Sequence, residues 1–328
     1  MGVGLVTGYL LRRAGQALVV LWAAFTLSFV LLYLLPGDAV LAKLGGGEAA
    51  ATVTGAQLAQ ARAEYGLDDP WPVQYGKRLL SALHGDFGRS IATGDSATHM
   101  VVAALPPTLA VAGLGLVLAV VLGGGAALAG TYTRARWLGT LLLSLPPLGI
   151  SLPVFWVGLV LVQIFSFQLR LLPALGNQGF ASVILPALTI SLPTGAVIGQ
   201  VLAKSLRTQL AEPYVETVRA KGASRSRVHF GHALRNAAMP VLTMVGVVAG
   251  QLLAGSVVTE TVFSRDGVGR ITTSAVTGQD IPVVQAVIVL AAFFFVVVNL
   301  AVDLLYPLLD PRVRRDPVAR AGKELVHG

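Results

Sequence analysis

The residues of this sequence that come closest to a reactive site are His229 and His232, in the segment HFGH. A metalloprotease zinc site of the HExxH kind needs a glutamate beside its first histidine, and this segment has none. The sequence also has no GxxxxGK[ST] phosphate-binding loop, no GxSxG nucleophile elbow and no cysteine. These absences favour a protein that is not itself an enzyme and that binds no metal or cofactor.

The two histidines lie in a strongly basic block. Between Lys204 and Arg235 the sequence has seven Lys or Arg and two acidic residues. Each charge costs roughly 2.5–3.5 kcal/mol at the centre of a bilayer, so this block cannot cross a membrane. Pro213 suits the first turn of a helix, Gly222 the left-handed position after a helix, and Ser224 the N-cap of the next one. We predict two short helices, in EPYVETVRAKG and SRSRVHFGHALRN, which either sit in a groove of another protein or form a solvated amphipathic hairpin.

The chain as a whole has too little charge for a water-soluble protein. Of its 328 residues, 55% are hydrophobic and 12% are charged, whereas about a quarter of the residues of ordinary globular proteins are charged. Six runs without Asp, Glu, Lys or Arg reach the roughly 20 residues that a helix needs to cross a bilayer. These runs are 14–35, 101–130, 137–169, 171–203 (its membrane part beginning near Val183), 236–259 and 281–302. The sequence therefore predicts an all-α integral membrane protein with six transmembrane helices.

The predicted spans divide the chain into four parts. Residues 1–35 hold the first span, 36–100 an extracytoplasmic helical loop, 101–308 a core of five spans, and 309–328 a cytoplasmic tail. The loop has helix-like patterning in GAQLAQARAEYGL and in LDDPWPVQYGKRLLSALHGDFGRSI, separated by Pro70 and Pro72. It can be a cap on the membrane surface or a docking surface for an external partner, and both interpretations stay open.

Proline and glycine are frequent in the predicted spans. The prolines are predicted to interrupt the third span (Pro146, Pro147 and Pro153) and the fourth (Pro186 and Pro193). Two GxxxG pairs, Gly195 with Gly199 and Gly246 with Gly250, allow helix backbones to approach closely. No ionisable residue lies deep inside a span, so the energy for any transport comes from another component.

The basic residues predict the orientation of the chain. Sixteen of the 24 Lys and Arg, and six of the 16 acids, fall on the side of the two termini. Without the long loop 36–100, only Arg170, Arg265 and Arg270 remain on the opposite side. The bias indicates that both termini are cytoplasmic and that these basic residues lie near anionic lipid. They are spread over separate pieces with little aromatic interleaving, which argues against nucleic-acid binding.

The block YVETVRAKGASRSRVHFGHALRNAAMPVLT resembles the EAA loop, the cytoplasmic coupling loop of ABC-importer permeases, in the form found in the dipeptide/oligopeptide/nickel permease family. Other segments resemble the same family in the same order. They are LLRRAGQAL, LLYLLPGDAV, YGLDDPWPVQYGKRLLSALHGDFGRSI, LPPTL, ILPALTISLP, ETVFSRDGVGR, QDIPVVQAVIVL and VNLAVDLLYPLLDPRVR. The resemblance is greatest to the first permease subunit of a dipeptide importer, a type I ABC-importer permease with a cytoplasmic coupling helix–turn–helix.

The resemblance assigns residues 211–237 to coupling with an ATPase subunit. Glu216 and Gly222 match the Glu and Gly of the EAA(x)3G pattern, whereas Thr217 and Val218 replace its alanines. HALRNAAMP stands where the general pattern has Ile-x-Leu-Pro, as in the peptide-permease branch of the family. The candidate coupling residues are Tyr214, Val215, Glu216, Arg219, Ala220, Lys221, Gly222 and Ala223.

The resemblance further implies an importer of short peptides in the bacterial inner membrane. A second permease subunit completes the translocation path, two ABC ATPase subunits bind the ATP, and an extracytoplasmic binding protein delivers the substrate. Small or neutral polar groups are expected along the path. The candidates, which can equally be helix–helix hydrogen bonds, are Gln200, Thr243, Gln251 and Ser256.

Two alternatives remain open at this stage. Within the family, the cargo can be nickel, glutathione or another small solute, because the permease sequence says little about it. In a different class, the chain can be a membrane scaffold whose basic block binds a cytoplasmic protein without transport.

Overall fold

The computed structural model describes residues 3–34 and 69–309. Over these residues the chain is helical, apart from turns and an isolated bridge between Arg89 and Ser96. The prediction of an all-α protein is therefore confirmed. The predicted helix in GAQLAQARAEYGL and the tail from residue 310 onward lie outside the described residues.

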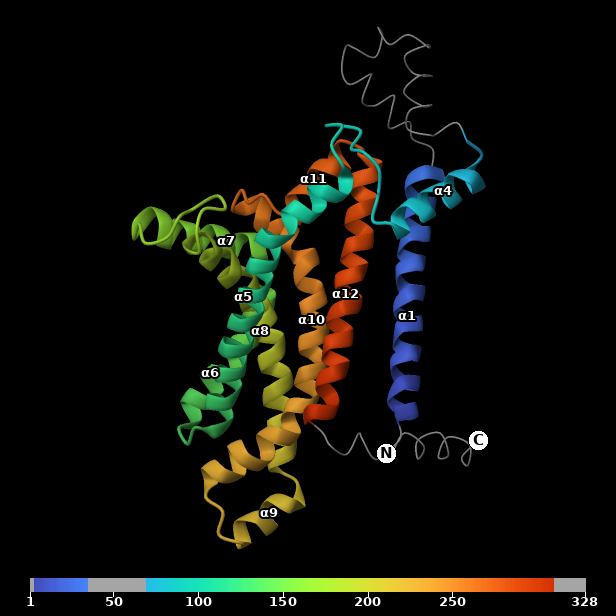
Figure 1. The fold of residues 1–328 in the computed structure, drawn as a ribbon. Helices are drawn as coiled ribbons and strands as arrows, with labels where there is room; N and C mark the ends of the chain where they lie inside the picture. The colour runs from blue at the N-terminus through green and yellow to red at the C-terminus, as the bar shows by residue number, and fades with distance from the viewer. Residues whose placement is uncertain (1–2, 35–68, 310–328) are drawn as a thin grey trace. The chain divides into compact units, whose positions relative to one another are not determined.

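The helices belong to two compact units, which Figure 1 shows as a ribbon. The first unit consists of Met1–Ala110, Leu175–Asn177 and Ser256–Val296. Its elements are α1 (Val3–Phe29) with the π-helical turn η1 (Val30–Leu34), α4 (Trp71–Leu83), the first part of α5 (Ala97–Tyr132), α11 (Val268–Thr277) and most of α12 (Ile281–Leu309). Its core joins α5, α11 and α12 through Ala97, Val101, Ala275, Val283, Val284, Ala286 and Val287.

The second unit consists of Val111–Ala174, Gln178–Gly255 and Val297–Gly328. It holds the rest of α5 together with α6 (Arg136–Ser151), α7 (Val154–Leu161), the π-helix η3 (Val162–Gln168), α8 (Ala181–Leu210), α9 (Pro213–Ala220), the π-helix η4 (Arg227–Ala233) and most of α10 (Leu234–Val262). More than half of the residues of α8 are buried. Because its buried residues pack with residues of α5 and α10, α8 forms the centre of this unit.

Five helical segments within the described ranges are long and apolar enough to cross a membrane: Arg12–Tyr33, Ala97–Tyr132, Ala181–Leu210, Arg227–Leu252 and Ile281–Ala301. They match five of the six predicted spans. The remaining predicted span, 137–169, is a pair of helices bent by 106° between Ser151 and Val154. Counting this pair as one broken span gives six.

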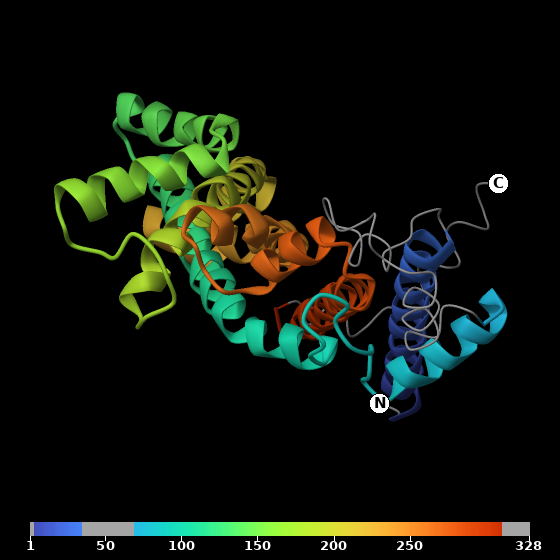
Figure 2. The ribbon, with the colours of Figure 1, turned by 90° about the horizontal axis from the view of Figure 1, so that it is seen from above.

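Proline explains the bend but does not break every helix in which it lies. Pro153 is the residue before α7, with an extended backbone, and Figure 2 shows how sharply the chain turns between α6 and α7. By contrast, the predictions that Pro146 and Pro147 interrupt the third span and that Pro186 and Pro193 interrupt the fourth were wrong, because α6 continues through the first two and α8 through the other two. Transmembrane helices tolerate proline where neighbouring groups satisfy the freed backbone, and α8 is packed along most of its length.

Glycine lets α5 and α8 come into backbone contact. A Cβ atom placed on Gly123 of α5 would lie 1.9 Å from the carbonyl oxygen of Gly195 in α8. A Cβ atom on Gly199 would lie 2.9 Å from the carbonyl oxygen of Gly123. The Gly195/Gly199 pair therefore makes the close approach that its spacing predicts. In the second pair, on α10, Gly246 is buried.

We expect Gly123→Ala to destabilise the protein by at least ~1–3 kcal/mol, because the backbone of α8 must move away from the new methyl group. Gly125→Ala is the matched control, since a Cβ atom at Gly125 meets no atom within 4 Å. The measurement is the thermal unfolding midpoint of each variant in detergent. Equal midpoints for the two variants would contradict the backbone contact.

Candidate functional site

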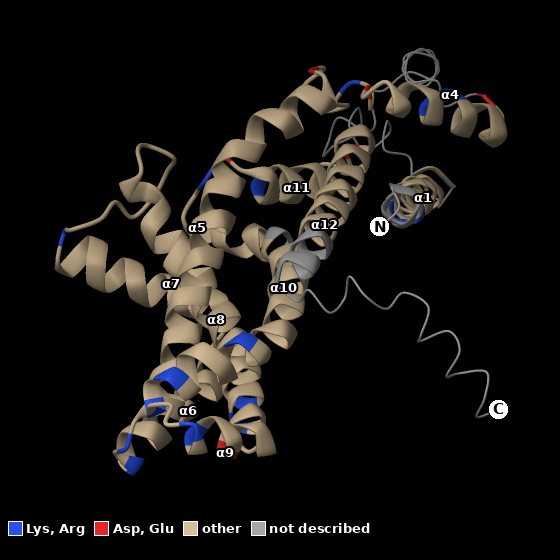
Figure 3. Cartoon of the chain, turned by 60° about the horizontal axis from the view of Figure 1, so that its bottom comes forward, with Lys and Arg blue, Asp and Glu red and all other residues tan. Residues whose placement is uncertain are grey.

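The basic loop, residues 211–237, has the charge concentration that the sequence predicts. Figure 3 shows Lys and Arg residues gathered around α9 and the nearby part of α6. α9 begins at Pro213 and is followed by Gly222 at a φ of +84°, the left-handed conformation that glycine adopts without strain. The predicted first helix and its stop are confirmed.

Two backbone hydrogen bonds close the end of α9. The N–H of Ala223 donates to the carbonyl of Val218 over 3.2 Å, and the N–H of Gly222 donates to the carbonyl of Arg219 over 2.9 Å. This pair of bonds is the Schellman motif, which satisfies carbonyls that a helix end otherwise leaves without partners. α9 is therefore a well-terminated helix although it is only eight residues long.

The second predicted helix exists but is not separate from the fifth span. Ser224 acts as its N-cap, since the Ser224 Oγ accepts a hydrogen bond from the N–H of Arg227 over 3.3 Å. The helix then passes through the π-helical segment η4 directly into α10. The prediction of two short, self-contained helices was therefore wrong for the second one, which is the beginning of a long helix.

The candidate coupling residues divide by burial. Val215 is buried, and Tyr214 is half-buried, with its hydroxyl donating to the Gln209 Oε1 over 3.3 Å. Ala223 is also half-buried. The candidates on the surface are Glu216, Arg219, Ala220, Lys221 and Gly222. Inward-facing residues thus hold α9 in place, and the outward-facing ones form the surface that a partner can reach.

Contacts between η4 and the end of α5 are the part of this site that the sequence did not predict. The Arg225 guanidinium donates to the carbonyl of Tyr132, the last residue of α5, and its Cζ lies 4.9 Å from the centre of the Tyr132 ring. His229 is buried, with its Nε2 3.0 Å from the Thr131 Oγ1. His232, in contrast, is exposed. Within the described ranges there is no group of three or more potential metal-ligating His, Cys, Asp or Glu side chains.

The four candidate path residues do not form one cluster. Gln200 on α8 and Thr243 on α10 are exposed, and Gln251 on α10 lines a pocket of about 180 Å³ in the second unit. Pro193 and Thr194 of α8 line the same pocket. Ser256 belongs to the first unit and is buried. Three of the four can therefore face a passage.

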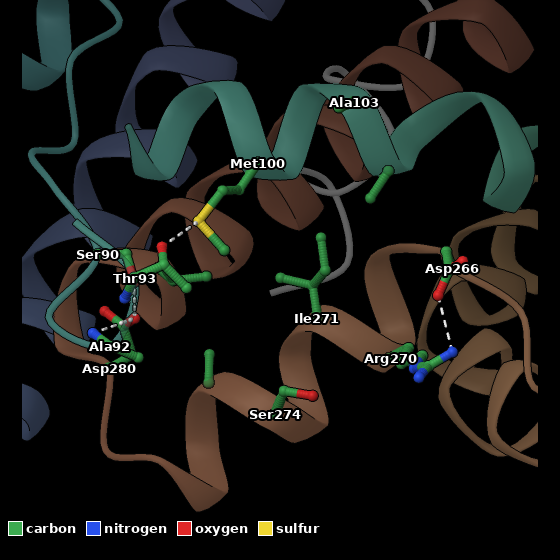
Figure 4. A pocket seen from close by; sticks show the side chains of 13 residues that line it. Ser90, Ala92, Thr93, Met100, Ala103, Asp266, Arg270, Ile271, Ser274 and Asp280 are labelled. Atoms are coloured by element: carbon green, nitrogen blue, oxygen red, sulfur yellow. Dashed lines mark hydrogen bonds and ion pairs between the residues drawn. The ribbon is translucent and has the colours of Figure 1, made fainter. Parts of the chain in front are cut away.

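The first unit contains a larger pocket, of about 410 Å³, lined by α5, α11 and the loop before α5. Figure 4 shows Asp280 at one end of it and the ion pair between Arg270 and Asp266, 2.7 Å apart, at the other. Asp280 is buried and accepts hydrogen bonds from the Ser90 hydroxyl and from the N–H groups of Ile91 and Ala92. The carboxylate thus fixes the loop before α5 to the turn that precedes α12.

A second buried carboxylate organises the segment ETVFSRDGVGR. Glu260, near the end of α10, accepts a hydrogen bond from the Thr108 hydroxyl over 2.5 Å and one from the N–H of Arg270 over 3.1 Å. The same Thr108 oxygen accepts from the N–H of Val268 over 2.9 Å. Glu260 and Thr108 together satisfy N–H groups at the start of α11, where a negative charge is favoured.

Arg265 and Gly267 complete this cluster. Burial lowers the pKa of the Arg265 guanidinium, and the negative charge of Glu260 opposes this shift. Arg265 also donates to the carbonyl of Gly176 over 2.9 Å. A Cβ atom on Gly267 would lie 2.2 Å from a Glu260 carboxylate oxygen, so any larger residue there would have to displace this carboxylate. The resemblance singled out ETVFSRDGVGR, but a linear sequence does not show that Thr108 is its partner.

Two family models match this chain. "Binding-protein-dependent transport system inner membrane component" matches residues 115–315, and the corresponding N-terminal model matches residues 6–112. Together they cover most of the chain, including the basic loop and both buried carboxylates.

Proteins that are similar to this chain over nearly their whole length are named as permease proteins of transport systems. "Probable peptide ABC transporter permease protein y4tP" of Sinorhizobium fredii is 36% identical over 93% of this chain and 99% of its own length. "Glutathione transport system permease protein GsiC" of Salmonella paratyphi A is 37% identical over 93% of this chain and 98% of its own. The solved structure of the inward-facing MetNI methionine ABC transporter superposes with a TM-score of 0.51 at 16% identity, covering 64% of this chain and 96% of its own. That likeness supports the predicted ABC-importer permease fold.

We expect Glu260→Ala to destabilise the protein by on the order of 3 kcal/mol, because it leaves the Thr108 hydroxyl and N–H groups of α11 buried without their acceptor. Asp266→Asn is the control, since the Asp266–Arg270 pair has side chains 79% and 52% exposed and an exposed pair contributes little. Thermal unfolding midpoints in detergent provide the comparison. If the two variants lose the same stability, the capping role of Glu260 is wrong.

Proposed function

The chain belongs to the family of inner-membrane components of binding-protein-dependent transport systems, and from this premise we propose that it is a permease subunit of an ATP-driven importer of short peptides. The proposal adds a substrate class and specific partners to the family membership. The partners are a second, homologous permease subunit, two ABC ATPase subunits and an extracytoplasmic binding protein.

The names of similar proteins support peptides as the substrate class. The Sinorhizobium relative, which matches 93% of this chain, is named a peptide permease. The Salmonella relatives at similar identity are named glutathione permeases, so glutathione, itself a small peptide derivative, is the second candidate. Both candidates need a neutral, hydrated path. Gln200, Thr243 and Gln251, exposed on α8 and α10, are suited to line it.

The surface of α9 is the observation that carries the coupling role. Glu216, Arg219, Ala220 and Lys221 are exposed on a helix whose inner side is fixed by Val215 and whose end is closed by a Schellman motif. A short helix with an exposed polar face can dock into a groove of an ATPase subunit and transmit its movement. This arrangement favours a coupling element over a solvated hairpin.

We further propose that both termini and the basic loop are cytoplasmic. The gathering of Lys and Arg around α9 supports this orientation, because positively charged loops are retained on the cytoplasmic side. ATP is then bound and hydrolysed by the partner subunits and not by this chain, whose sequence has no phosphate-binding loop. Anionic lipid headgroups are expected around the basic residues.

The test uses an importer reconstituted from two permease and two ATPase subunits, together with its binding protein. We expect alanyl-alanine or trialanine to stimulate ATP hydrolysis and to accumulate in proteoliposomes. Free alanine is the control and should do neither. Stimulation by glutathione alone would replace the peptide assignment with the second candidate. A complex that assembles but responds to none of these compounds would refute import of short peptides.

We expect a Cys introduced by Ala220→Cys to cross-link to a Cys engineered in the groove of an ATPase subunit. The reason is that Ala220 is exposed on α9, and docking brings Cα atoms within the ~4.4–6.8 Å that a disulfide requires. The chain has no native cysteine, so the reaction is specific to the introduced thiol. The yield, read from gels, should change when ATP closes the ATPase dimer.

Ala92→Cys serves as the matched control, because Ala92 is exposed in the loop before α5. It should never cross-link to the ATPase, and a membrane-impermeant maleimide added to intact spheroplasts should label it but not Ala220→Cys. Labelling in the opposite pattern would reverse the proposed orientation. Failure of Ala220→Cys to cross-link anywhere along the groove of an assembled complex would refute coupling through α9.

A further inference from the structure

The basic loop is fastened to the rest of the second unit at the last turn of α5. Arg225 stands between α9 and η4, and its guanidinium donates to the carbonyl of Tyr132, with the Thr133 carbonyl 3.5 Å away. Carbonyls at the end of a helix have no partner within the helix and carry partial negative charge. A guanidinium is well suited to this position, because it supplies several donors and a permanent positive charge.

The ring of Tyr132 adds further contacts to the same place. The Arg225 Cζ lies 4.9 Å from the ring centre, within the range of a cation–π interaction. The rings of His229 and Phe230 lie 5.3 Å and 5.2 Å from it, centre to centre. One aromatic side chain of α5 thus contacts three residues of the segment that connects α9 to α10.

His229 makes a second polar contact with α5, and its direction can be derived. The Thr131 hydroxyl lies 2.7 Å from the carbonyl of Ala127, to which it donates its single proton. The Thr131 oxygen must therefore accept from His229 Nε2, which lies 3.0 Å away. In the neutral ring Nδ1 then has no proton, and among the described residues it has no hydrogen-bond partner. Protonation would bury an unsatisfied N–H near Arg225, so the geometry favours the neutral ring with one fixed tautomer.

α9 has few other attachments. Val215 is its only buried residue, and Tyr214 bonds weakly to Gln209 at the end of α8 and to Asn236 at the start of α10, over 3.3 and 3.5 Å. Beside the short chain connection to α8, the contacts of Arg225 and His229 therefore offer a route by which a force on the exposed face of α9 can reach α5.

We propose that these two contacts, Arg225 with Tyr132 and His229 with Thr131, form a latch that transmits the movement of α9 to α5, and that Arg225 is a positioning residue for transport. The proposal rests on the proposed coupling role of the basic loop. It assigns to Arg225 a role separate from docking, because its guanidinium faces α5 and not the exposed side of α9.

The test uses the complete importer with Arg225→Ala, supplied with trialanine, or with glutathione if the wild-type complex responds to that compound instead. We expect the variant to assemble with the ATPase subunits and to keep its basal ATP hydrolysis. Stimulation by the loaded binding protein, and the number of substrate molecules imported per ATP, should both fall at least about fivefold, a typical size for a lost coupling.

Arg225→Lys and Arg227→Ala are the matched variants. A lysine ammonium can still donate to the Tyr132 carbonyl and lie over its ring, so Arg225→Lys should restore most of the import per ATP. Arg227 lies two residues further on, is exposed, and makes no contact of this kind with α5 within the described ranges. Its replacement by alanine should leave import per ATP unchanged.

The possible outcomes distinguish failure of the latch proposal from failure of the proposed transport function. If the wild-type complex transports and Arg225→Ala imports as much per ATP as the wild type, the latch is wrong and the proposed function stands. If the wild-type complex shows no response to trialanine or glutathione, the proposed function itself fails and the latch role fails with it. A purely structural role for Arg225 would lower basal hydrolysis, stability and import together, which would also overturn the latch.

Should Arg225→Ala not assemble, Thr131→Val carries the test, because it removes the acceptor of His229 while keeping the shape of the side chain. Reduced import per ATP at normal basal hydrolysis supports the latch, and unchanged import per ATP overturns it.

Discussion

The exclusion of uncompensated charge and unpaired backbone groups from an apolar interior is the constraint on which this structure depends. A bilayer offers no water to replace a missing hydrogen bond, so each polar group must find its partner inside the protein or lie at an end of a span. The two buried carboxylates of the first unit show how the constraint is met. Glu260 and Asp280 each accept hydrogen bonds from a hydroxyl and from backbone N–H groups, and each thereby ties a turn to a segment far away in the sequence.

The same constraint acts on helix packing in the second unit. Where apolar side chains gain little from leaving lipid, helices associate by close backbone approach, which small residues permit. Gly123, Gly195 and Gly199 bring α5 and α8 together in this way. The backbone contact also limits movement of α5 relative to α8, because backbone atoms cannot change position by rotamer changes as side chains can. Under the proposed latch, α8 would therefore move together with α5.

Sequence reasoning succeeded where structure is determined locally. Pro213, Gly222 and Ser224 act through their own backbone preferences and neighbouring N–H groups, and all three lie where those preferences place them. It succeeded for most spans because length and the absence of charge suffice to define them. It failed for Pro186, where tertiary packing allows α8 to continue, and for the junction of η4 with α10, where no stop signal separates two helices.

The long-range pairs could not be predicted at all. Nothing in the local sequence around Glu260 points to Thr108, and nothing around Arg225 points to Tyr132, since each pair is formed by the fold. The family resemblance indicated which segments matter without indicating what they contact.

In the proposed coupling role, the basic loop has to satisfy two requirements, and a single short helix can meet both only if different faces serve each one. A surface that docks a partner must be exposed and polar, whereas an element that transmits force must be anchored. α9 exposes Glu216, Arg219 and Ala220 and buries Val215, and its length allows one buried anchor of its own. The additional anchoring has to come from the segment that follows, where the left-handed turn at Gly222 redirects the chain and Arg225 reaches the free carbonyl at the end of α5. Docking and anchoring are thereby assigned to different residues, so that the docking face can change without loss of the connection to α5.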